Sequence, residues 1–600
     1  MEAKTILTTN EKLAKLRQKM AQNKLTAYYI NTADPHQSEY VADHFKNRAW
    51  LTGFTGSAGY ALVTADAALL WVDGRYYIQA AKQIAGSEFE MMKMGNSDYP
   101  TLNQYLAQTL RAGDSLGVNG EMVSQKAFED FQALLNPLGV DLKSDLQLVE
   151  DIWSDRPPMP QSKVFVHEPQ YTGLTAAEKV DLVREKMAED GVESALYAGL
   201  NDICWLFNIR ADDIKNTPVV ISYALISRDG ATLYVDQSKL DQNVQKHLAE
   251  NGITVRDYAQ VFSDLEQLES KSLVVDKNMV NHKLFAQVPE GVKILDKTDY
   301  PYAIKSCLNP VELENQRRAY VRDAVALTKF IYYVKKNVGK VQLDELKVEE
   351  VLHNLRAEQE NFLDDSFSTI AAYGPNAAMM HYSASPESFS QIQPSGFLLV
   401  DSGGHYLDGT TDITRTISCG PLTDEEIRDY SLTLKSHINL ARAVFLSGVT
   451  GYYLDVLARQ PLWQHHMDYK CGTGHGVGYL LSVHEGPQRF NMTYKPVPLH
   501  PGMVITNEPG VYKEGSHGIR LENDYVVAED QKVGADQYLK LDCLSFVPFD
   551  RAAIDTAYLE GYEVDWFNAY QKKVYDLLSP YLTESERAWL ESETQPLDKK

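Results

Sequence analysis

A repeat within the first half of the chain constrains its fold more than any other feature. Three pairs of similar segments occur in the same order, and the second copies lie 167, 155 and 163 residues after the first. The pairs are LRQKM (residues 16–20) and VREKM (183–187), WLTGF (50–54) and WLFNI (205–209), and LWVD (70–73) and LYVD (233–236). Both copies begin with a helical pattern that leads into an apolar strand, so the repeat predicts two related α/β domains in tandem.

The positions of proline and a long helical pattern suggest where these domains end. The chain has 600 residues, more than one hydrophobic core usually holds, so we expect several domains. The stretch Asp151–Gly173 contains four prolines, as linkers do, and a long amphipathic helix is predicted after Asn309–Pro310. We therefore predict domains at residues 1–160, 161–308 and 309–600. The third would carry a helical extension at its C-terminal end, from about residue 551.

Charge and cysteine content narrow the classes of partner and compartment. A net charge of −24 argues against nucleic acid and anionic membrane surfaces as partners, because both are negatively charged. The five cysteines are scattered and contain no CxxC pair, so we expect neither a disulfide framework nor a thiolate zinc site. The first twenty residues lack the apolar core of a signal peptide, and no apolar run of about 18 residues occurs. These features predict a cytoplasmic protein.

Two aspartates at strand ends are the first candidate site residues. The segment FLLVDSG predicts a buried strand that ends with Asp401. The turn signal Asp408–Gly409 and the β-branched residues after it place Asp412 on a returning strand, eleven residues further along the chain. Across such a connection the two carboxylates are close enough to share a site. A buried, unpaired aspartate is costly, and bound cations would remove that cost.

An imidazole and two glutamates complete the candidate set. His475 lies in GTGHGVG, whose alternating glycines let backbone or ligand approach the ring closely. Glu508 follows an apolar strand and precedes a Pro–Gly turn, and Glu522 lies in a second apolar strand. Four carboxylates and one imidazole match the ligand preference of two hard divalent ions. A two-metal site lowers the pKa of a water molecule between the ions and stabilises the oxyanion that forms on a carbonyl.

The motifs around these residues resemble those of the pita-bread metallopeptidases, in the same order along the chain. They are VDSG (400–403), TDITRT (411–416), GTGHGVG (472–478), VHEGP (483–487), NEPG (507–510) and GIRLEN (518–523). Within that family the chain is most similar to the large, three-domain Xaa-Pro aminopeptidases, and the resemblance covers essentially its whole length. It implies an α/β (α+β) fold with two related creatinase-like domains followed by a pita-bread catalytic domain.

The resemblance also implies the roles of the candidate residues. Asp401, Asp412, His475, Glu508 and Glu522 would be the metal ligands, with Asp412 and Glu522 shared between the two ions. A hydroxide that bridges the ions would attack the scissile carbonyl, and Glu508 would handle the proton of the attacking water.

Further residues are implied to assist the reaction. His381 and His484 would hydrogen-bond the scissile peptide and the tetrahedral intermediate. Arg520 would contact the ligand carboxylates, and Arg415 would have a similar role.

The implied reaction is the release of one N-terminal residue from peptides with proline in the second position. The proline ring would occupy an apolar pocket lined by aromatic residues such as Tyr382 and Tyr512. Because proline has a fixed φ and no N–H, such a pocket rejects other residues by shape. The ligand set favours two Mn²⁺ ions, although Zn²⁺ or Co²⁺ would also suit it. The family resemblance further suggests a homodimer.

Four alternatives have the same fold. Prolidase cleaves Xaa-Pro dipeptides and typically has one N-terminal domain, and methionine aminopeptidase uses the same five ligands without such a pair of domains. Creatinase-like hydrolases lack the intact carboxylate set, and a non-catalytic pita-bread binding protein would have degraded ligands. All five ligand positions are intact here, and neither a nucleophile motif nor HExxH is present.

Overall fold

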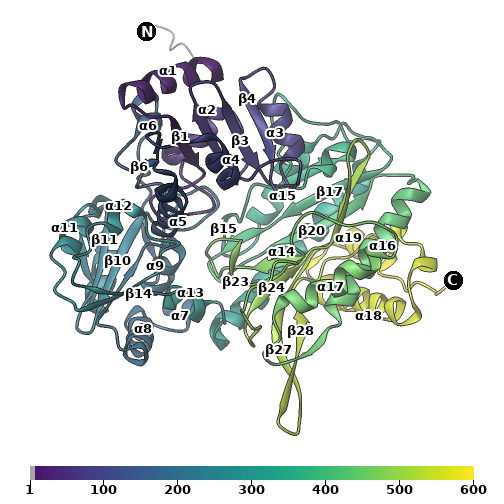
Figure 1. Cartoon of the computed structure of the whole chain (residues 1–600). Coiled ribbons are helices and arrows are strands. Elements are labelled where there is room, and N and C mark those ends of the chain that lie inside the picture. Colours follow the sequence, from purple (N-terminus) through teal and green to yellow (C-terminus); the bar gives the residue numbers. More distant parts are fainter. Residues whose placement is uncertain (1–6) are drawn as a thin grey trace. The chain divides into compact units, whose positions relative to one another are not determined.

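The computed structural model describes residues 7–600, which form two compact units (Figure 1). Unit 1 comprises residues 7–167 and 174–301, and unit 2 comprises residues 168–173 and 302–600. The first six residues of the predicted first domain lie outside the described part of the chain. The domain boundaries drawn from the sequence, after residues 160 and 308, stay predictions.

Unit 1 contains two six-stranded sheets with the same topology. The strand orders are β4-β3-β2-β1-β5-β6 and β12-β11-β10-β8-β13-β14. In both sheets the second strand in chain order pairs antiparallel with the third. The strand at each edge of the sheet pairs parallel with its neighbour. The strands of the first sheet are β1 (Ala27–Asn31), β2 (Tyr60–Thr64), β3 (Ala68–Val72), β4 (Phe89–Lys93), β5 (Ser115–Gly117) and β6 (Asp141–Lys143). Those of the second are β8 (Ser194–Tyr197), β10 (Ser222–Ser227), β11 (Ala231–Val235), β12 (Thr254–Arg256), β13 (Ser272–Val275) and β14 (Lys293–Asp296).

The matched sequence segments occupy equivalent elements of these two sheets. LRQKM lies in helix α1 (Thr9–Gln22) and VREKM in α8 (Ala176–Asp190), each directly before the first strand of its sheet. LWVD and LYVD lie at β3 and β11, the third strands. The predicted tandem repeat is therefore confirmed. The other helices of unit 1 are α2 (Asn47–Thr52), α3 (Tyr77–Gln83), α4 (Leu102–Thr109), α5 (Gln125–Leu135), α6 (Leu148–Ile152), α9 (Leu200–Leu206), α10 (Gln242–Glu250), α11 (Gln260–Glu266) and α12 (His282–Phe285).

Unit 2 is built on a larger sheet and several small ones. The six-stranded sheet has the order β21-β28-β27-β24-β22-β23, and a three-stranded sheet has the order β16-β17-β20. The strands of the larger sheet are β21 (Val444–Leu446), β22 (Gly474–Gly476), β23 (Glu485–Phe490), β24 (Val504–Asn507), β27 (Asn523–Val533) and β28 (Asp536–Cys543). The strands of that three-stranded sheet are β16 (Ile370–Tyr373), β17 (Phe397–Ser402) and β20 (Ile413–Ser418). A second three-stranded sheet contains β15 (Phe362–Asp365), β18 (Gly404–Tyr406) and β19 (Gly409–Thr410). A two-stranded hairpin contains β25 (Gly510–Lys513) and β26 (His517–Arg520).

Helices cover these sheets, and the long predicted helix after Asn309 is present. It is α14 (Pro310–Asn337), and Asn309 caps it in a capping box with Glu312. The predicted capping boxes at Thr423 and Thr583 begin α16 (Asp424–Ala441) and α19 (Glu584–Glu593). Helix α18 (Gly561–Leu578) buries Tyr570 and Val574 in the same core as α14 and α16. The remaining helices are α7 (Pro169–Thr172), α13 (Tyr300–Lys305), α15 (Glu345–Ala357) and α17 (Gly451–Trp463).

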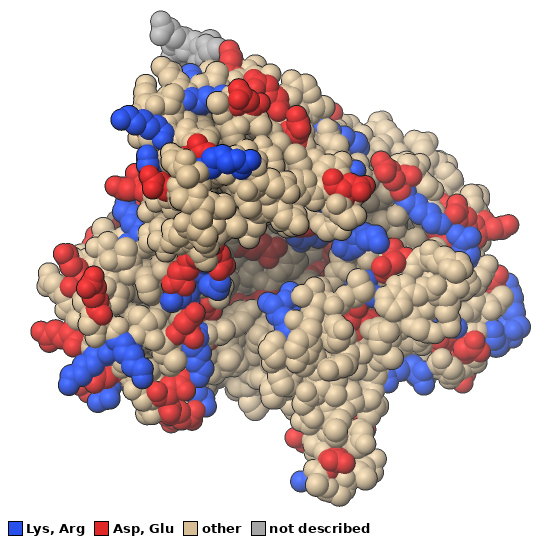
Figure 2. Space-filling model, viewed as in Figure 1, with Lys and Arg blue, Asp and Glu red and all other residues tan. Residues whose placement is uncertain are grey.

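Among residues 7–600, every helix lacks either the length or the apolar composition that crossing a bilayer requires. Acidic and basic side chains are interspersed on the face shown in Figure 2. Acidic residues outnumber basic ones in the sequence, 82 to 58.

Candidate metal centre

The two candidate aspartates lie at neighbouring ends of one antiparallel strand pair. Asp401 is in β17 and stands opposite Thr414 of β20, and Asp412 directly precedes β20. The turn region between them forms its own short strands, β18 and β19, which pair with each other. The predicted close approach of the two aspartates follows from this direct pairing of β17 with β20.

The two glutamates flank a second strand pair. Asn507 of β24 pairs with Asn523 of β27, so Glu508 directly follows one strand and Glu522 directly precedes the other. Glu522 therefore lies between β26 and β27, whereas the sequence pattern placed it within a strand. The Thr414 hydroxyl donates to Oε2 of Glu522 at 2.6 Å, and this bond links the two strand pairs.

His475 is at the centre of the short strand β22, between two close neighbours. A Cβ added at Gly474 would lie 2.0 Å from the carbonyl oxygen of Thr506, and one at Gly476 would lie 2.1 Å from that of Glu485. Any side chain at either position would clash with backbone. The alternating glycines are therefore required by the packing of β22 between β23 and β24.

The hydrogen bond of His475 sets the tautomer of its ring. Nδ1 lies 2.9 Å from the carbonyl oxygen of Gly476, which can only accept, so Nδ1 carries the hydrogen. In the neutral ring, Nε2 is then an acceptor. Nε2 lies 3.6 Å from Oδ2 of Asp412 and 3.6 Å from Oε1 of Glu508. Nε2 of His475 thus faces two carboxylate oxygens.

The cluster carries more negative charge than its protein neighbours compensate. Burial raises the pKa of Asp412 well above its usual value, and repulsion from Glu522 and Asp401 raises it further. Burial and then repulsion from Glu508 do the same to the pKa of Glu522. Burial also raises the pKa of Glu508 to about 7. Since neighbouring protein groups disfavour ionisation here, cations are the natural counter-charge.

These residues fit divalent cations. Ligand atoms of Asp412, His475 and Glu522 all lie within 4.8 Å of one another. Oδ1 of Asp401 and Oδ1 of Asp412 are buried and have no hydrogen-bond partner among the described residues. Unpaired buried carboxylate oxygens beside an imidazole nitrogen are the donor set that Mn²⁺, Zn²⁺ or Co²⁺ binds.

Arg520 and the two further histidines surround this cluster. Nη2 of Arg520 donates to Oδ2 of Asp401 at 2.6 Å and to the carbonyl of Met380, the residue before His381. The His484 ring stands edge-on to the His475 ring, with the centroids 4.4 Å apart. His484 also lowers the pKa of Glu508 against the larger effect of burial. The structure thus brings His484 and Arg520 to the cluster and places His381 next to the Arg520 contact.

Models of known families match almost the whole chain. "Metallopeptidase family M24" matches residues 314–529, and the "C-terminal region of peptidase_M24" matches residues 537–597. Two models, both described as "Creatinase/Prolidase N-terminal domain", match residues 12–150 and 155–312. A probable Xaa-Pro aminopeptidase P of Neurospora crassa is 38% identical over 99% of this chain and 90% of its own length.

The chain belongs to metallopeptidase family M24. Aminopeptidase P2 of Arabidopsis thaliana is 34% identical over 100% of this M24 chain and 90% of its own length. The crystal structure of X-prolyl aminopeptidase from Caenorhabditis elegans, described as a cytosolic enzyme with a di-nuclear active site, matches with a TM-score of 0.95. It is 32% identical, over 98% of this chain and 100% of its own.

Prolidases match a shorter part of this M24 chain. A Xaa-Pro dipeptidase from Bacillus anthracis has a TM-score of 0.51 and 21% identity, over 63% of this chain and 99% of its own. The whole of that molecule therefore aligns while more than a third of this chain is left over.

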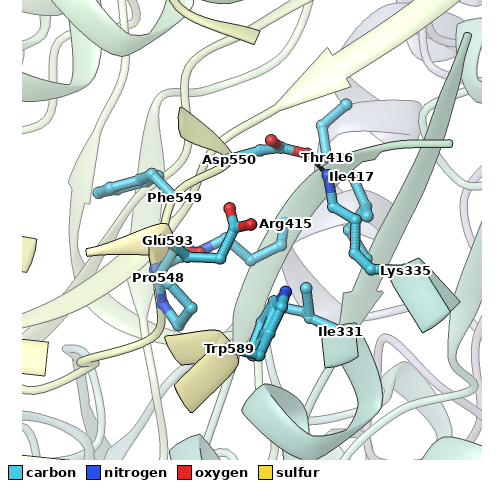
Figure 3. Close-up of a pocket in the computed structure, with 10 residues that line it drawn as sticks. All are labelled: Ile331, Lys335, Arg415, Thr416, Ile417, Pro548, Phe549, Asp550, Trp589 and Glu593. Carbon is cyan, nitrogen blue, oxygen red and sulfur yellow. Dashed lines mark hydrogen bonds and ion pairs between the residues drawn. The ribbon is translucent and has the colours of Figure 1, made fainter. Parts of the chain in front are cut away.

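Arg415 does not have the role expected from the sequence. Its guanidinium is buried and donates to the backbone carbonyls of Glu522 and Val547 and to the side chains of Asn523 and Tyr570. It contacts the backbone of Glu522 and not its carboxylate. Figure 3 shows Arg415 in a small cavity with α14, α19 and the segment around Phe549. Arg415 therefore joins the strand end at the metal centre to the C-terminal part of this M24 chain.

The two aromatic residues expected to line a proline pocket differ in their surroundings. The Tyr512 hydroxyl accepts from Nη1 of Arg520 at 2.7 Å, so its ring lies beside the cluster. The Tyr382 hydroxyl instead donates to Glu345 at 2.8 Å, and its ring packs in an apolar core that includes Leu399. Tyr512 therefore fits a pocket at this site better than Tyr382 does.

The sequence reasoning missed two buried residues behind Asp412. Asp524 accepts a hydrogen bond from the Tyr320 hydroxyl and another from the backbone N–H of Asp412. Asp524 lies two residues after Glu522, and this spacing is a signal that could have revealed it. Tyr320 is in the middle of α14, where nothing in the sequence distinguishes it from a core residue.

Proposed function

We propose that this M24 chain is a metal-dependent aminopeptidase that releases the N-terminal residue from peptides with proline in the second position. The single observation that carries the proposal is the full-length match to Xaa-Pro aminopeptidases, which includes both N-terminal domains. The alternative, a Xaa-Pro dipeptidase, is supported over a much shorter part of the chain.

Five residues would hold two divalent cations: Asp401, Asp412, His475, Glu508 and Glu522. Such ions, when bound, lower the pKa of a water molecule and polarise the peptide carbonyl. We favour Mn²⁺, because four carboxylates and one imidazole make a predominantly oxygen ligand set. Elemental analysis of protein purified without added metal tests this choice, and a bound metal other than Mn²⁺ would reject it.

Other steps depend on the side chains themselves. Glu508 accepts the proton of the attacking water and passes it to the proline nitrogen as that nitrogen leaves. His484 and His381 donate hydrogen bonds to the developing oxyanion and to the scissile peptide. Arg520 holds Asp401 in place through the 2.6 Å contact.

Metal content separates the proposed roles of the two neighbouring histidines. His475→Ala removes a ligand, so metal occupancy should fall. His484→Ala removes a hydrogen-bond donor, so kcat should fall while both metals stay bound. Equal loss of metal in the two purified variants would show that this division of roles is wrong.

A peptide panel tests the reaction itself. We expect cleavage of Xaa-Pro-Xaa tripeptides between residues one and two, with Xaa-Ala-Xaa at least about 10²-fold slower in kcat/KM. Xaa-Pro dipeptides should be poorer than tripeptides, because they lose contacts that position the scissile bond. A clear preference for the dipeptide would move the assignment to a dipeptidase, and indifference to proline would reject the proposed specificity.

The proposed compartment is the cytoplasm. The five cysteines form no disulfide within residues 7–600, as in a reducing environment, and the matched enzyme of Caenorhabditis elegans is described as cytosolic. Fractionation of cells that express the chain tests this, and recovery outside the cytoplasmic fraction would contradict it.

The proposed assembly is a homodimer through the outer face of α17. Tyr453 on this helix is 61% exposed, and Val456 and Trp463 are also exposed. The ring of Tyr494, itself exposed, packs edge-on to that of Tyr452 and extends this apolar face. Apolar surface of this kind marks interaction sites. Val456→Asp should convert a dimer to a monomer in analytical ultracentrifugation, and a wild-type monomer would reject the proposal.

A further inference from the structure

Arg489 is a half-buried cation that has no anionic partner within the described part of the chain. It lies in β23, and its Nε is buried without a hydrogen-bond acceptor. Its guanidinium makes no hydrogen bond and no ion pair within residues 7–600. Burial lowers the pKa of Arg489, and the nearby Tyr302 opposes that effect. In a chain with a net charge of −24, an arginine without a carboxylate partner needs an explanation.

The nearest carboxylate on its own strand is already occupied. Glu485, at the start of β23, lies 2.7 Å from Nζ of Lys305, and the two side chains are 7% and 1% exposed. This buried pair neutralises Glu485. Arg489 is therefore left with its charge available to a group that is not part of the protein.

The sheet register directs Arg489 toward the metal centre. Arg489 pairs directly with His475 across the antiparallel strands β22 and β23. Residues opposite each other in such a pair have their side chains on the same face, with Cβ atoms about 5 Å apart. The next residue, Phe490, points the other way into an apolar core. Arg489 thus shares a face with the imidazole whose Nε2 lies 3.6 Å from Asp412 and Glu508.

We infer that Arg489 binds the C-terminal carboxylate of tripeptide substrates and so sets the preferred substrate length. In an extended peptide each residue spans about 3.3–3.6 Å, so the carboxylate of a tripeptide lies about 7 Å beyond the scissile carbon. That of a dipeptide lies about half as far. The Arg489 guanidinium lies one strand away from the predicted metal ligand His475, which suits the longer distance of the tripeptide carboxylate. A guanidinium can bind a carboxylate through two parallel hydrogen bonds.

The inference rests on the proposed Xaa-Pro activity and is tested by a ratio. For the wild type, kcat/KM should be about 10- to 100-fold higher for an Xaa-Pro-Xaa acid than for the same peptide with a C-terminal amide. Arg489→Met should bring this ratio close to one. The kcat/KM for the acid should fall, whereas the kcat/KM for the amide should stay within about twofold of wild type. Arg489→Lys should keep part of the preference, because it keeps the charge but not the paired donors.

A matched control separates this effect from the loss of one positive charge. Arg228 is a surface arginine, 68% exposed, and Arg228→Met should leave the acid-to-amide ratio unchanged. Inhibition by the free Pro-Xaa product gives a second readout: the acid should inhibit the wild type more strongly than its amide, and Arg489→Met should remove the difference.

Two results would overturn the inference while leaving the proposed function intact. One is a wild-type acid-to-amide ratio close to one, with both peptides cleaved. The other is an equal loss of activity toward acid and amide in Arg489→Met. If the wild type cleaves neither Xaa-Pro peptide, the proposed function fails and this inference fails with it.

Discussion

Each unit contains a buried set of charged side chains, and the two sets differ in whether positive and negative charges balance. In unit 1, Nζ of Lys239 lies 2.6 Å from Oδ2 of Asp213, and the side chains are 3% and 0% exposed. That pair is balanced, one charge against one. At the metal centre of unit 2, Asp401 has the Arg520 guanidinium at 2.6 Å, whereas Asp412 and Glu522 face other carboxylates.

The difference shows which buried charge is structural and which is functional. In a buried pair such as Lys239–Asp213 each charge has an opposite partner, so the pair requires no counter-charge from outside the protein. The carboxylates around His475 are not compensated in this way, and their raised pKa values express that deficit. Stability alone would not favour such an arrangement, so the imbalance supports the proposal that cations bind here.

The largest effect expected is on turnover, from a change at Glu508. Glu508→Ala should lower kcat by at least about 10³-fold, the scale seen when a key electrostatic group is lost, and exhaustive chelation should also abolish activity. The counterpart in unit 1 is Asp213→Asn, which should lower the melting temperature and leave kcat unchanged. Steady-state kinetics and thermal unfolding of both variants provide the measurement. A folded Glu508→Ala variant with near-wild-type turnover would contradict the role of Glu508.

An intermediate effect is expected from a second pair of matched changes. Lys305→Met and Lys239→Met each remove the ammonium from a buried ion pair, so each should cost about 3–5 kcal/mol of stability. Only Lys305 pairs with Glu485, the residue next to His484. Lys305→Met should therefore also lower kcat, by about tenfold, because the loop that positions His484 loosens. Lys239→Met should keep kcat within about twofold.

Two further readouts distinguish positioning from a general loss of stability. The KM of Lys305→Met and its metal content should stay close to wild type, and Lys305→Arg should recover part of the kcat. If the two Met variants lose kcat equally at a temperature where both are folded, the positioning role of Lys305 is wrong.

The sequence predicted the candidate cluster well because its residues lie at strand ends. Asp401, Asp412 and Glu508 follow or precede strongly apolar segments, and such segments reveal strands. The glycines around His475 likewise reflect close packing of backbone, which the structure shows on both sides of β22. The repeat in unit 1 could be found because equivalent elements kept similar residues.

Other features depend on contacts that have no local pattern. Tyr320 and Asp524 are 204 residues apart in sequence, and only the packing of α14 against β27 brings them together. Arg415 was expected near the ligand carboxylates because of its place in the family motif TDITRT. The alternation of strand β20 instead turns its side chain away from that of Thr414, which donates to Glu522. Its backbone partners could be known only from the fold.

The smallest effect expected is a pH-dependent difference in stability between metal-loaded and chelated protein. Burial raises the pKa of Glu508 from 4.5 to about 7 in the folded chain. The folded, metal-free protein therefore binds a proton that the unfolded chain releases. Its contribution to stability is present below about pH 4.5 and is lost as the pH rises through about 7. One pKa unit corresponds to 1.36 kcal/mol, so this loss is about 3 kcal/mol.

Cations take the place of that proton, so the difference in melting temperature between loaded and chelated protein should widen from pH 5 to pH 8. A widening of about 5 °C is expected, since 1 kcal/mol shifts the melting temperature by about 2–4 °C in domains of 150–250 residues. Differential scanning fluorimetry across this pH range measures it. Glu508→Gln cannot titrate, so its chelated form should lose less stability with rising pH than chelated wild type does. A difference that stays constant from pH 5 to pH 8 would mean that the carboxylate cluster is not where the cations act, and the contrast with the balanced pair in unit 1 would lose its meaning.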